Sequence, residues 1–174
     1  MILTHLGFPL TFIQWIMCCI NSVSFAILIN GSTSRSFRVD KGLRQGCPLS
    51  PLLFLLVMEG LSIRISTEKD DGNLKRLKIT DQCSLTHLLF VDDILIFLDG
   101  GLHDIITFTG ILRLFSLATG MECNQTKSTI SHSRCTQQEI ILALQNFPFQ
   151  IQALKDGLNY LGFMIKPDGY KITD

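Results

Sequence analysis

Charged residues are scarce at the start of this sequence. No Lys, Arg, Asp or Glu occurs before Arg35, and Asp40 is the only acidic residue before Glu59. A secretory signal peptide begins with basic residues and ends at a small-residue cleavage site, and this N-terminal pattern matches neither feature. We therefore expect the apolar N-terminal run to belong to the folded protein.

Zinc-binding cysteine pairs are also lacking, because no CxxC occurs and no His stands at zinc-finger spacing from a cysteine. The absence argues against a zinc-finger module. We expect the cysteines to be scattered, buried free thiols in a protein of a reducing compartment. The six cysteines are Cys18, Cys19, Cys47, Cys83, Cys123 and Cys135.

An excess of charge of either sign is missing as well. The formal net charge is zero and the isoelectric point is about 6.9, so nothing global attracts the chain to nucleic acid and any such affinity must be local. The chain is instead rich in apolar residues, at 47% hydrophobic, 17% charged and a mean hydropathy of +0.33. A chain of 174 residues has room for one domain with a sizeable core. Its high apolar content suggests that some apolar surfaces are covered by other segments or partners.

The apolar run over residues 12–29 is long enough to suggest a membrane span. Polar residues interrupt it, however, and its character changes from a helical pattern around Trp15 to a β-rich one. The β-rich part ends in Asn30-Gly31, a strong hairpin signal. We expect a buried helix with Trp15 in the core, followed by a hairpin, and we keep a small membrane protein anchored by residues 12–29 as an alternative.

The dense basic stretch Arg35, Arg38, Lys41 and Arg44 follows the hairpin. It predicts either a solvated strand and loop or local contacts with nucleic-acid phosphates. The next segment predicts an apolar helix with Ser50 as its N-cap and Pro51 at its first position.

The later segments predict further helices and strands. Residues 104–118 are expected to form a helix that ends near Gly120, residues 127–133 a short strand, and residues 136–146 a second helix. Residues 158–173 are expected to form a strand, a Pro-Asp-Gly turn and a return strand. One α+β domain with hairpins fits this order best.

Two adjacent carboxylates, Asp92 and Asp93, stand between the apolar runs of "THLLFVDDILIF". Asp is a common turn residue, so a plain hairpin turn explains the pair. Repulsion and partial desolvation on such an apolar platform are conditions that a divalent cation offsets, so a metal site is the alternative.

Taken in order, the motifs resemble the reverse transcriptase domain of plant LINE-type (non-LTR) retrotransposons. "GFPLTFIQWIMCCINSVSFAILINGS" is similar to the helix and hairpin that follow the first catalytic strand of that family. "KGLRQGCPLSPLLFLLVMEGLS" resembles its second polymerase motif, "HLLFVDDILIF" its third, and "ATGMECNQTKS" its fourth. "GLNYLGFMIKPDGY" resembles the segment that opens the thumb-proximal region.

This resemblance implies a partial polymerase palm, an antiparallel sheet backed by helices, with part of the fingers. It implies that Asp92 and Asp93 are catalytic carboxylates that bind Mg²⁺ or Mn²⁺, with Asp92 as the direct ligand and Asp93 nearer the primer. The implied partners are an RNA template, a DNA primer and deoxynucleoside triphosphates, and no membrane is expected. The metals would join the primer terminus to the incoming nucleotide.

Further site residues follow from the resemblance. Gln45 and Gly46 match the loop beside template and nucleotide, and Pro48 and Ser50 shape it; Gly46 alone also suits an ordinary turn. Phe90 stands where many reverse transcriptases have Tyr. Lys127 matches a lysine near the triphosphate, although a solvated lysine just after a turn explains it in the isolated chain.

The sequence departs from the family pattern at two positions within these motifs. Cys47 replaces the usual Asp and Val91 the usual Ala. The first change removes a charge beside the nucleotide loop, and the second adds bulk next to the metal turn.

No acidic residue matches the further Asp that a two-metal polymerase takes from an earlier strand, because Asp40 stands in the wrong context. We therefore expect residues 1–174 to be a single incomplete reverse transcriptase domain. It would lack the first catalytic motif upstream and most of the thumb downstream, it would have little activity alone, and the missing parts would belong to a longer polyprotein.

A non-catalytic nucleic-acid or protein-binding remnant is the alternative from another class of function. The resemblance is compatible with a nuclear or cytoplasmic protein and with an organelle-encoded one.

Overall fold

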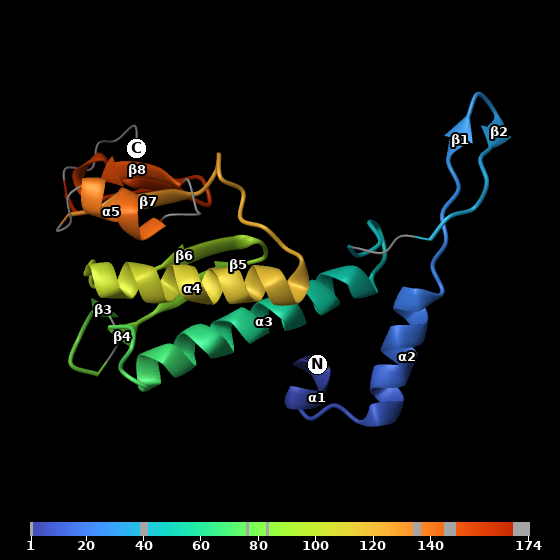
Figure 1. Cartoon of the computed structure of the whole chain (residues 1–174), viewed down its shortest axis with the longest axis horizontal. Helices are drawn as coiled ribbons and strands as arrows, with labels where there is room; N and C mark the ends of the chain where they lie inside the picture. The colour runs from blue at the N-terminus through green and yellow to red at the C-terminus, as the bar shows by residue number, and fades with distance from the viewer. Residues whose placement is uncertain are drawn as a thin grey trace. The chain divides into compact units, whose positions relative to one another are not determined.

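The computed structural model describes residues 2–38, 42–75, 77–82, 84–133, 137–144 and 149–168 (Figure 1). The chain divides into two compact units, Met1–Gly60 and Leu61–Asp174. Helices and small sheets together make an α+β protein, as predicted.

The first unit contains helices α1 (Ile2–His5) and α2 (Leu10–Asn21) and the start of α3 (Leu49–Asp70). Its core joins the three helices through Leu3, Ile13, Ile16 and Leu53. Ile13 and Ile16 share one face of α2 because residues three apart are neighbours on a helix.

The expectation that Trp15 belongs to the core is wrong, since its side chain is 68% exposed. Trp15 lies on the face of α2 opposite the one that Ile13 and Ile16 bury. The expectation of buried thiols also fails for Cys18 and Cys19 at the end of the same helix, because both are exposed. Cys47 and Cys123 are half-buried. Cys83 and Cys135 lie outside the described residues.

The hairpin after α2 is confirmed. Strands β1 (Leu28–Ile29) and β2 (Ser32–Thr33) pair antiparallel around Asn30 and Gly31. Both turn residues have positive φ, +48° and +81°, which is the backbone of a type I′ turn and the reason that Asn-Gly favours it.

Residues 12–29 do not form one helix, because α2 ends at Asn21. A helix of 12 residues is about 18 Å long, whereas the hydrocarbon core of a bilayer is about 30 Å thick. By length and composition α3 and α4 (Leu102–Thr119) meet the criteria for a membrane-spanning helix. The core helix of a soluble protein meets the same criteria.

Helix α3 begins two residues earlier than the sequence predicts. Leu49 is already helical and Pro51 takes the third position, where its missing N–H is one of the four that have no partner within the helix. The Ser50 hydroxyl does not cap the helix but donates to the carbonyl oxygen of Arg44 at 2.7 Å.

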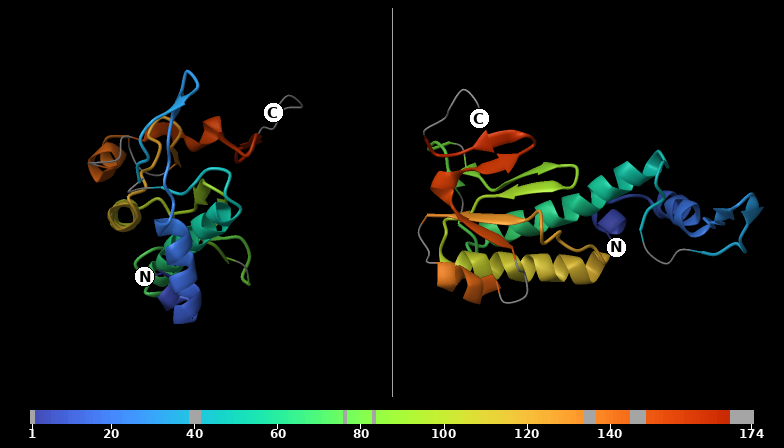
Figure 2. Two further views of the ribbon diagram at one scale, coloured as in Figure 1. Left: turned by 90° about the vertical axis from the view of Figure 1, so that its right-hand side faces the viewer. Right: turned by 90° about the horizontal axis from the view of Figure 1, so that it is seen from above.

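The second unit carries the remaining strands in pairs (Figure 2). The antiparallel pairs are β3 (Leu77–Lys78) with β4 (Ser84–Leu85), β5 (His87–Phe90) with β6 (Asp93–Ile96), and β9 (Leu158–Tyr160) with β10 (Phe163–Ile165). The parallel pair is β7 (Thr129–His132) with β8 (Gln150–Ala153), and a short 3₁₀ helix, η1 (Leu154–Asp156), follows. Among the described residues the strands form separate two-stranded sheets, whereas the resemblance implied one antiparallel sheet.

The core of the second unit includes Ile105 of α4 and Ile140 of α5 (Gln137–Leu144). Ile130, Phe149 and Ile151, from β7 and the β8 region, pack against them. The first predicted helix is thus confirmed within two residues of its expected ends, and the second is confirmed over residues 137–144, while its expected end residues 136 and 145–146 lie outside the described residues. Gly120, in the left-handed conformation at φ +71°, ends α4 as expected.

The single strand expected before the Pro-Asp-Gly turn is wrong, because it divides into β9 and β10; Gly169 of the expected turn lies outside the described residues. The turn between β9 and β10 is Leu161-Gly162, and Pro167 and Asp168 follow β10 as bends. The expected return strand continues into residues 169–173, which lie outside the described residues. Leu161 has φ +53° and Gly162 φ +83°, so only the second residue meets this backbone without strain.

Candidate metal-binding hairpin and nucleotide loop

Asp92 and Asp93 occupy different positions in the β5–β6 hairpin. The register pairs Phe90 with Asp93, so Val91 and Asp92 form the two-residue turn and Asp93 is the first residue of β6. Both aspartates are exposed. The sequence predicted the hairpin and its carboxylates but treated the two Asp residues together as the turn.

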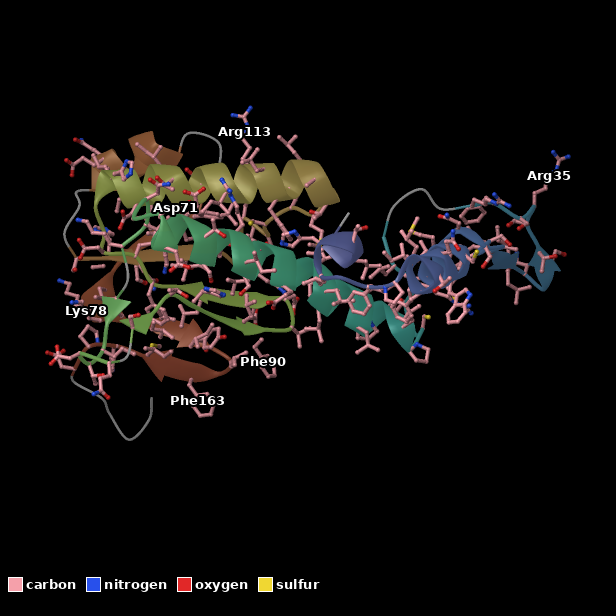
Figure 3. All side chains as sticks on the ribbon, turned by 90° about the horizontal axis from the view of Figure 1, so that it is seen from below. Arg35, Asp71, Lys78, Phe90, Arg113 and Phe163 are labelled. Carbon is pink, nitrogen blue, oxygen red and sulfur yellow. The ribbon has the colours of Figure 1, made fainter. Side chains whose placement is uncertain are left out.

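The two faces of the hairpin differ. Directly paired residues share a face, and the face with His87, Leu89, Ile94 and Ile96 is half-buried throughout. Phe90 and Asp93 lie on the opposite face. In Figure 3 the Phe90 side chain projects from the side of the hairpin away from α4. Asp93 therefore meets solvent on the face that the hairpin turns outward.

The hairpin is attached to α3 by polar contacts. Lys69, only 4% exposed, donates to the carbonyl oxygens of Thr86 at 3.0 Å and Phe97 at 3.2 Å. The Nε2 atom of His87 hydrogen bonds with the Ser62 hydroxyl, and its Nδ1 atom with the Thr86 hydroxyl, each at 2.8 Å. Hydroxyl groups donate or accept, so a neutral imidazole is satisfied at both nitrogens.

The two carboxylates suit a hard divalent cation. Mg²⁺ and Mn²⁺ prefer oxygen ligands, and Mg²⁺ keeps several waters when one or two carboxylates bind it. Among the described residues no group of three His, Cys, Asp or Glu side chains gathers where it could hold a metal ion. The arrangement thus fits an open, water-rich site with two protein ligands at most.

The predicted nucleotide loop lies in the first unit, directly before α3. Gln45, Gly46 and Pro48 are exposed and Ser50 is half-buried. Gly46 has φ +78°, a conformation that disfavours other residues. The positive φ alone explains why glycine stands at this position, so no bound ligand is needed to account for it. The space around its Cα is open and leaves room for a ligand.

Cys47 stands at the end of this loop. The backbone N–H of Leu49 holds the pKa of the Cys47 thiol below its ordinary value, partial desolvation opposes the shift, and Ser50 and the charge of Arg44 lower the pKa further. A backbone N–H, a hydroxyl and a cationic side chain thus surround Cys47, and all three favour the thiolate over the neutral thiol.

The basic residues that the structure describes in this stretch, Arg35, Arg38 and Arg44, are exposed. Lys41 lies outside the described residues. In the second unit Lys127 is also exposed, and its backbone N–H donates to the backbone and side-chain oxygens of Asn124 at 3.2 and 3.3 Å. These bonds show that Lys127 belongs to a turn, and the turn alone explains its backbone conformation.

The loop residues belong to the first unit, and Phe90, Asp92, Asp93 and Lys127 to the second. Sequence reasoning did not single out Lys69. One signal was present: Lys69 is the basic residue in the last turn of α3, where a cation suits the helix dipole.

Comparisons with known proteins agree on one family. The family described as "Reverse transcriptase (RNA-dependent DNA polymerase)" matches residues 2–165. Over 172 residues the chain is 26% identical to the Retrovirus-related Pol polyprotein from type-1 retrotransposable element R2 of Popillia japonica, covering 92% of the chain and 27% of that protein. Over 67 residues, 38% of the chain, it is 39% identical to an uncharacterized mitochondrial protein of Arabidopsis thaliana and covers 55% of it. The chain thus spans about a quarter of the first relative and about half of the second.

Proposed function

Since this chain belongs to the reverse transcriptase (RNA-dependent DNA polymerase) family, we propose that it is the metal-binding portion of an RNA-directed DNA polymerase from a plant LINE-type retrotransposon. The observation that carries the proposal is the exposed Asp92–Asp93 pair at the end of a hairpin, in a chain whose residues 2–165 match the family.

Asp92 and Asp93 bind Mg²⁺ or Mn²⁺ in this proposal, with Asp92 as the direct ligand. The bound metal supplies charge stabilisation during nucleotidyl transfer to a DNA primer on an RNA template. The residues proposed to contact template and deoxynucleoside triphosphate are Gln45, Gly46, Pro48, Ser50 and Phe90, and Lys127 meets the triphosphate. The exposure of Asp92, Gln45 and Lys127 supports these roles, because a group that meets a polymeric substrate must reach solvent.

We further propose that residues 1–174 form a single incomplete reverse transcriptase domain, part of a palm with part of the fingers, within a longer polyprotein. The R2 relative, a Pol polyprotein of which the chain covers 27%, supports this view. Two carboxylates without a third are insufficient for a two-metal mechanism, and among the described residues no third one gathers with them. We therefore expect the 174-residue chain to have little or no polymerase activity by itself.

Metal binding tests the proposal directly. We expect Mn²⁺, followed by electron paramagnetic resonance, to bind the chain weakly and to lose this site in Asp92→Asn. Asp156→Asn, at an exposed aspartate of η1, is the matched control and keeps the site. Equal Mn²⁺ binding by the wild type and Asp92→Asn would refute the proposed metal site.

Primer extension tests the expected inactivity. The chain, a DNA primer on an RNA template, deoxynucleoside triphosphates and Mg²⁺ should give no extension above that of Asp92→Asn. Primer extension by the wild type that is abolished in Asp92→Asn would show a working polymerase and would contradict the expected inactivity.

A second candidate function is nucleic-acid binding by residues 35–44. The exposure of Arg35, Arg38 and Arg44 favours it, because accessible cations bind phosphates and release counterions. Affinity for RNA should then fall steeply with salt and be lost in the Arg38→Ala, Arg44→Ala double variant. Affinity that does not change with salt would exclude this function.

A further inference from the structure

The β5–β6 hairpin does not fix its own direction. Within the described residues it is a two-stranded sheet with no third strand beside it, and an isolated hairpin of this size is marginally stable at best. The contacts that the hairpin makes with the rest of the unit therefore decide where the turn with Asp92 points, and they comprise its half-buried face and the bonds at its open end.

Lys69 contacts both strands at that open end. Thr86 immediately precedes β5 and Phe97 immediately follows β6, and the ammonium group of Lys69 donates to the carbonyl oxygen of each, at 3.0 and 3.2 Å. The N–H of Phe97 also donates to the Thr86 carbonyl at 3.0 Å. One side chain of α3 thus joins the first and last residues of the hairpin.

The chemistry of lysine suits this position. Its ammonium group has three donors and no acceptor, so it bonds two carbonyls from different strands at once. Lys69 is only 4% exposed, and burying an ammonium group is costly unless its donors form hydrogen bonds. The two carbonyl oxygens must therefore stay within bonding distance of the ammonium group, which restricts where the hairpin can lie. Ser62, two turns earlier on α3, holds His87 of the same hairpin.

We propose that Lys69 is a positioning residue that fixes the β5–β6 hairpin on α3 and thereby orients the Asp92–Asp93 pair for metal binding. The part that concerns metal rests on the proposed function. The anchor and the turn lie at opposite ends of four-residue strands, about 13 Å apart. Lys69 therefore acts through the hairpin and does not touch the metal.

The test compares four forms of the full chain with the wild type. Lys69→Met removes the donors but keeps the length, and Lys69→Arg restores donors. Lys155→Met makes the same chemical change at an exposed lysine of η1, and Asp92→Asn removes the proposed ligand. Terbium(III) luminescence reports metal binding at the turn, and hydrogen exchange reports the opening of residues 87–96.

We expect Lys69→Met to weaken terbium binding by about tenfold, the lower limit of the loss seen when a group bonded directly to a metal ligand is removed, because Lys69 acts through the hairpin. Residues 87–96 should exchange faster while α4 and α5 exchange as in the wild type. Lys69→Arg, which keeps the donors, should bind terbium and exchange hydrogen as the wild type does. Lys155→Met should also behave as the wild type.

Other results would overturn the assignment. If Lys69→Met left residues 87–96 unchanged, or speeded exchange equally throughout the chain, Lys69 would not position the hairpin. Should Lys69→Met fail to fold, Lys69→Gln, whose shorter neutral side chain cannot span both carbonyls, takes its place under the same criteria.

Failure of the proposed function gives a different result. Terbium binding that is absent from the wild type, or unchanged in Asp92→Asn, would remove the metal site. The exchange rates would still decide whether Lys69 anchors the hairpin.

Discussion

Phe90 and Asp93 face each other across the last pair of the β5–β6 hairpin, so an exposed aromatic ring borders an exposed carboxylate. This pairing leaves Val91 and Asp92 as the entire turn. Val91 has φ +53°, a left-handed conformation that is unfavourable for a β-branched residue. The residue beside the proposed metal ligand is therefore strained.

Relief of this strain should stabilise the protein. We expect Val91→Asn to raise the free energy of unfolding by about 1 kcal/mol, because Asn tolerates the left-handed region. Urea denaturation measures the change. Val91→Ile, which keeps the β-branch, should give no such gain, and a loss of stability in Val91→Asn would contradict the turn geometry.

Two neighbouring isoleucines of α5 should respond very differently to truncation. Ile140 is 0% exposed in the core of the second unit, whereas Ile141 is 55% exposed. We expect Ile140→Ala to lower the free energy of unfolding by about 2 to 5 kcal/mol. Ile141→Ala should change it by about 0.5 kcal/mol or less. Similar losses in both variants would show that α5 buries another face.

Cys47 should react with iodoacetamide before Cys123 at pH 8. The Leu49 N–H lowers the pKa of the Cys47 thiol, whereas burial raises that of Cys123, and the thiolate is the reactive form. Mass spectrometry of the labelled peptides measures the order. Earlier labelling of Cys123 would contradict it.

The same pKa shift predicts a pH dependence of stability. The folded pKa of Cys47 lies below its unfolded value, so its contribution is present above the unfolded pKa and is lost as the pH falls through the folded pKa. The stability difference between the wild type and Cys47→Ser should therefore grow as the pH rises toward the unfolded pKa. Denaturation at a series of pH values measures it, and a difference independent of pH would oppose the assignment.

Gly157 and Gly162 should differ in how much stability their replacement by Ala costs. A Cβ atom on Gly157 would lie 2.8 Å from Met164 Sδ and 3.1 Å from the Ile165 carbonyl oxygen, whereas one on Gly162 would meet open space. Gly162 has φ +83°, so Gly162→Ala should cost about 1 kcal/mol through the backbone. Gly157 has φ 78° and ψ 172°, a conformation that essentially only glycine adopts, so Gly157→Ala should cost about 1 to 3 kcal/mol through the backbone. Gly157→Ala should cost about 1 to 3 kcal/mol more through overpacking, as thermal or urea unfolding would show. Equal losses would argue against the close packing of β10 on Gly157.

Several local elements were predictable because short-range chemistry specifies them. The Asn30-Gly31 turn follows from the residues that accept positive φ, and the end of α4 follows from Gly120. The hairpin around Asp92 was visible as two apolar runs about a polar pair. The start of α3 was misplaced because both Ser50 and Pro51 also fit inside the first helical turn.

Sequence alone determined the family motifs, the local turns and the presence of two adjacent carboxylates. Tertiary structure decided that Trp15 is exposed, that Asp92 takes the turn while Asp93 begins a strand, and that Lys69 joins both ends of the hairpin. The physical reason is one of range. Turn and cap preferences depend on a few adjacent dihedral angles, whereas burial, strand register and a contact between residues 28 positions apart depend on how distant segments pack.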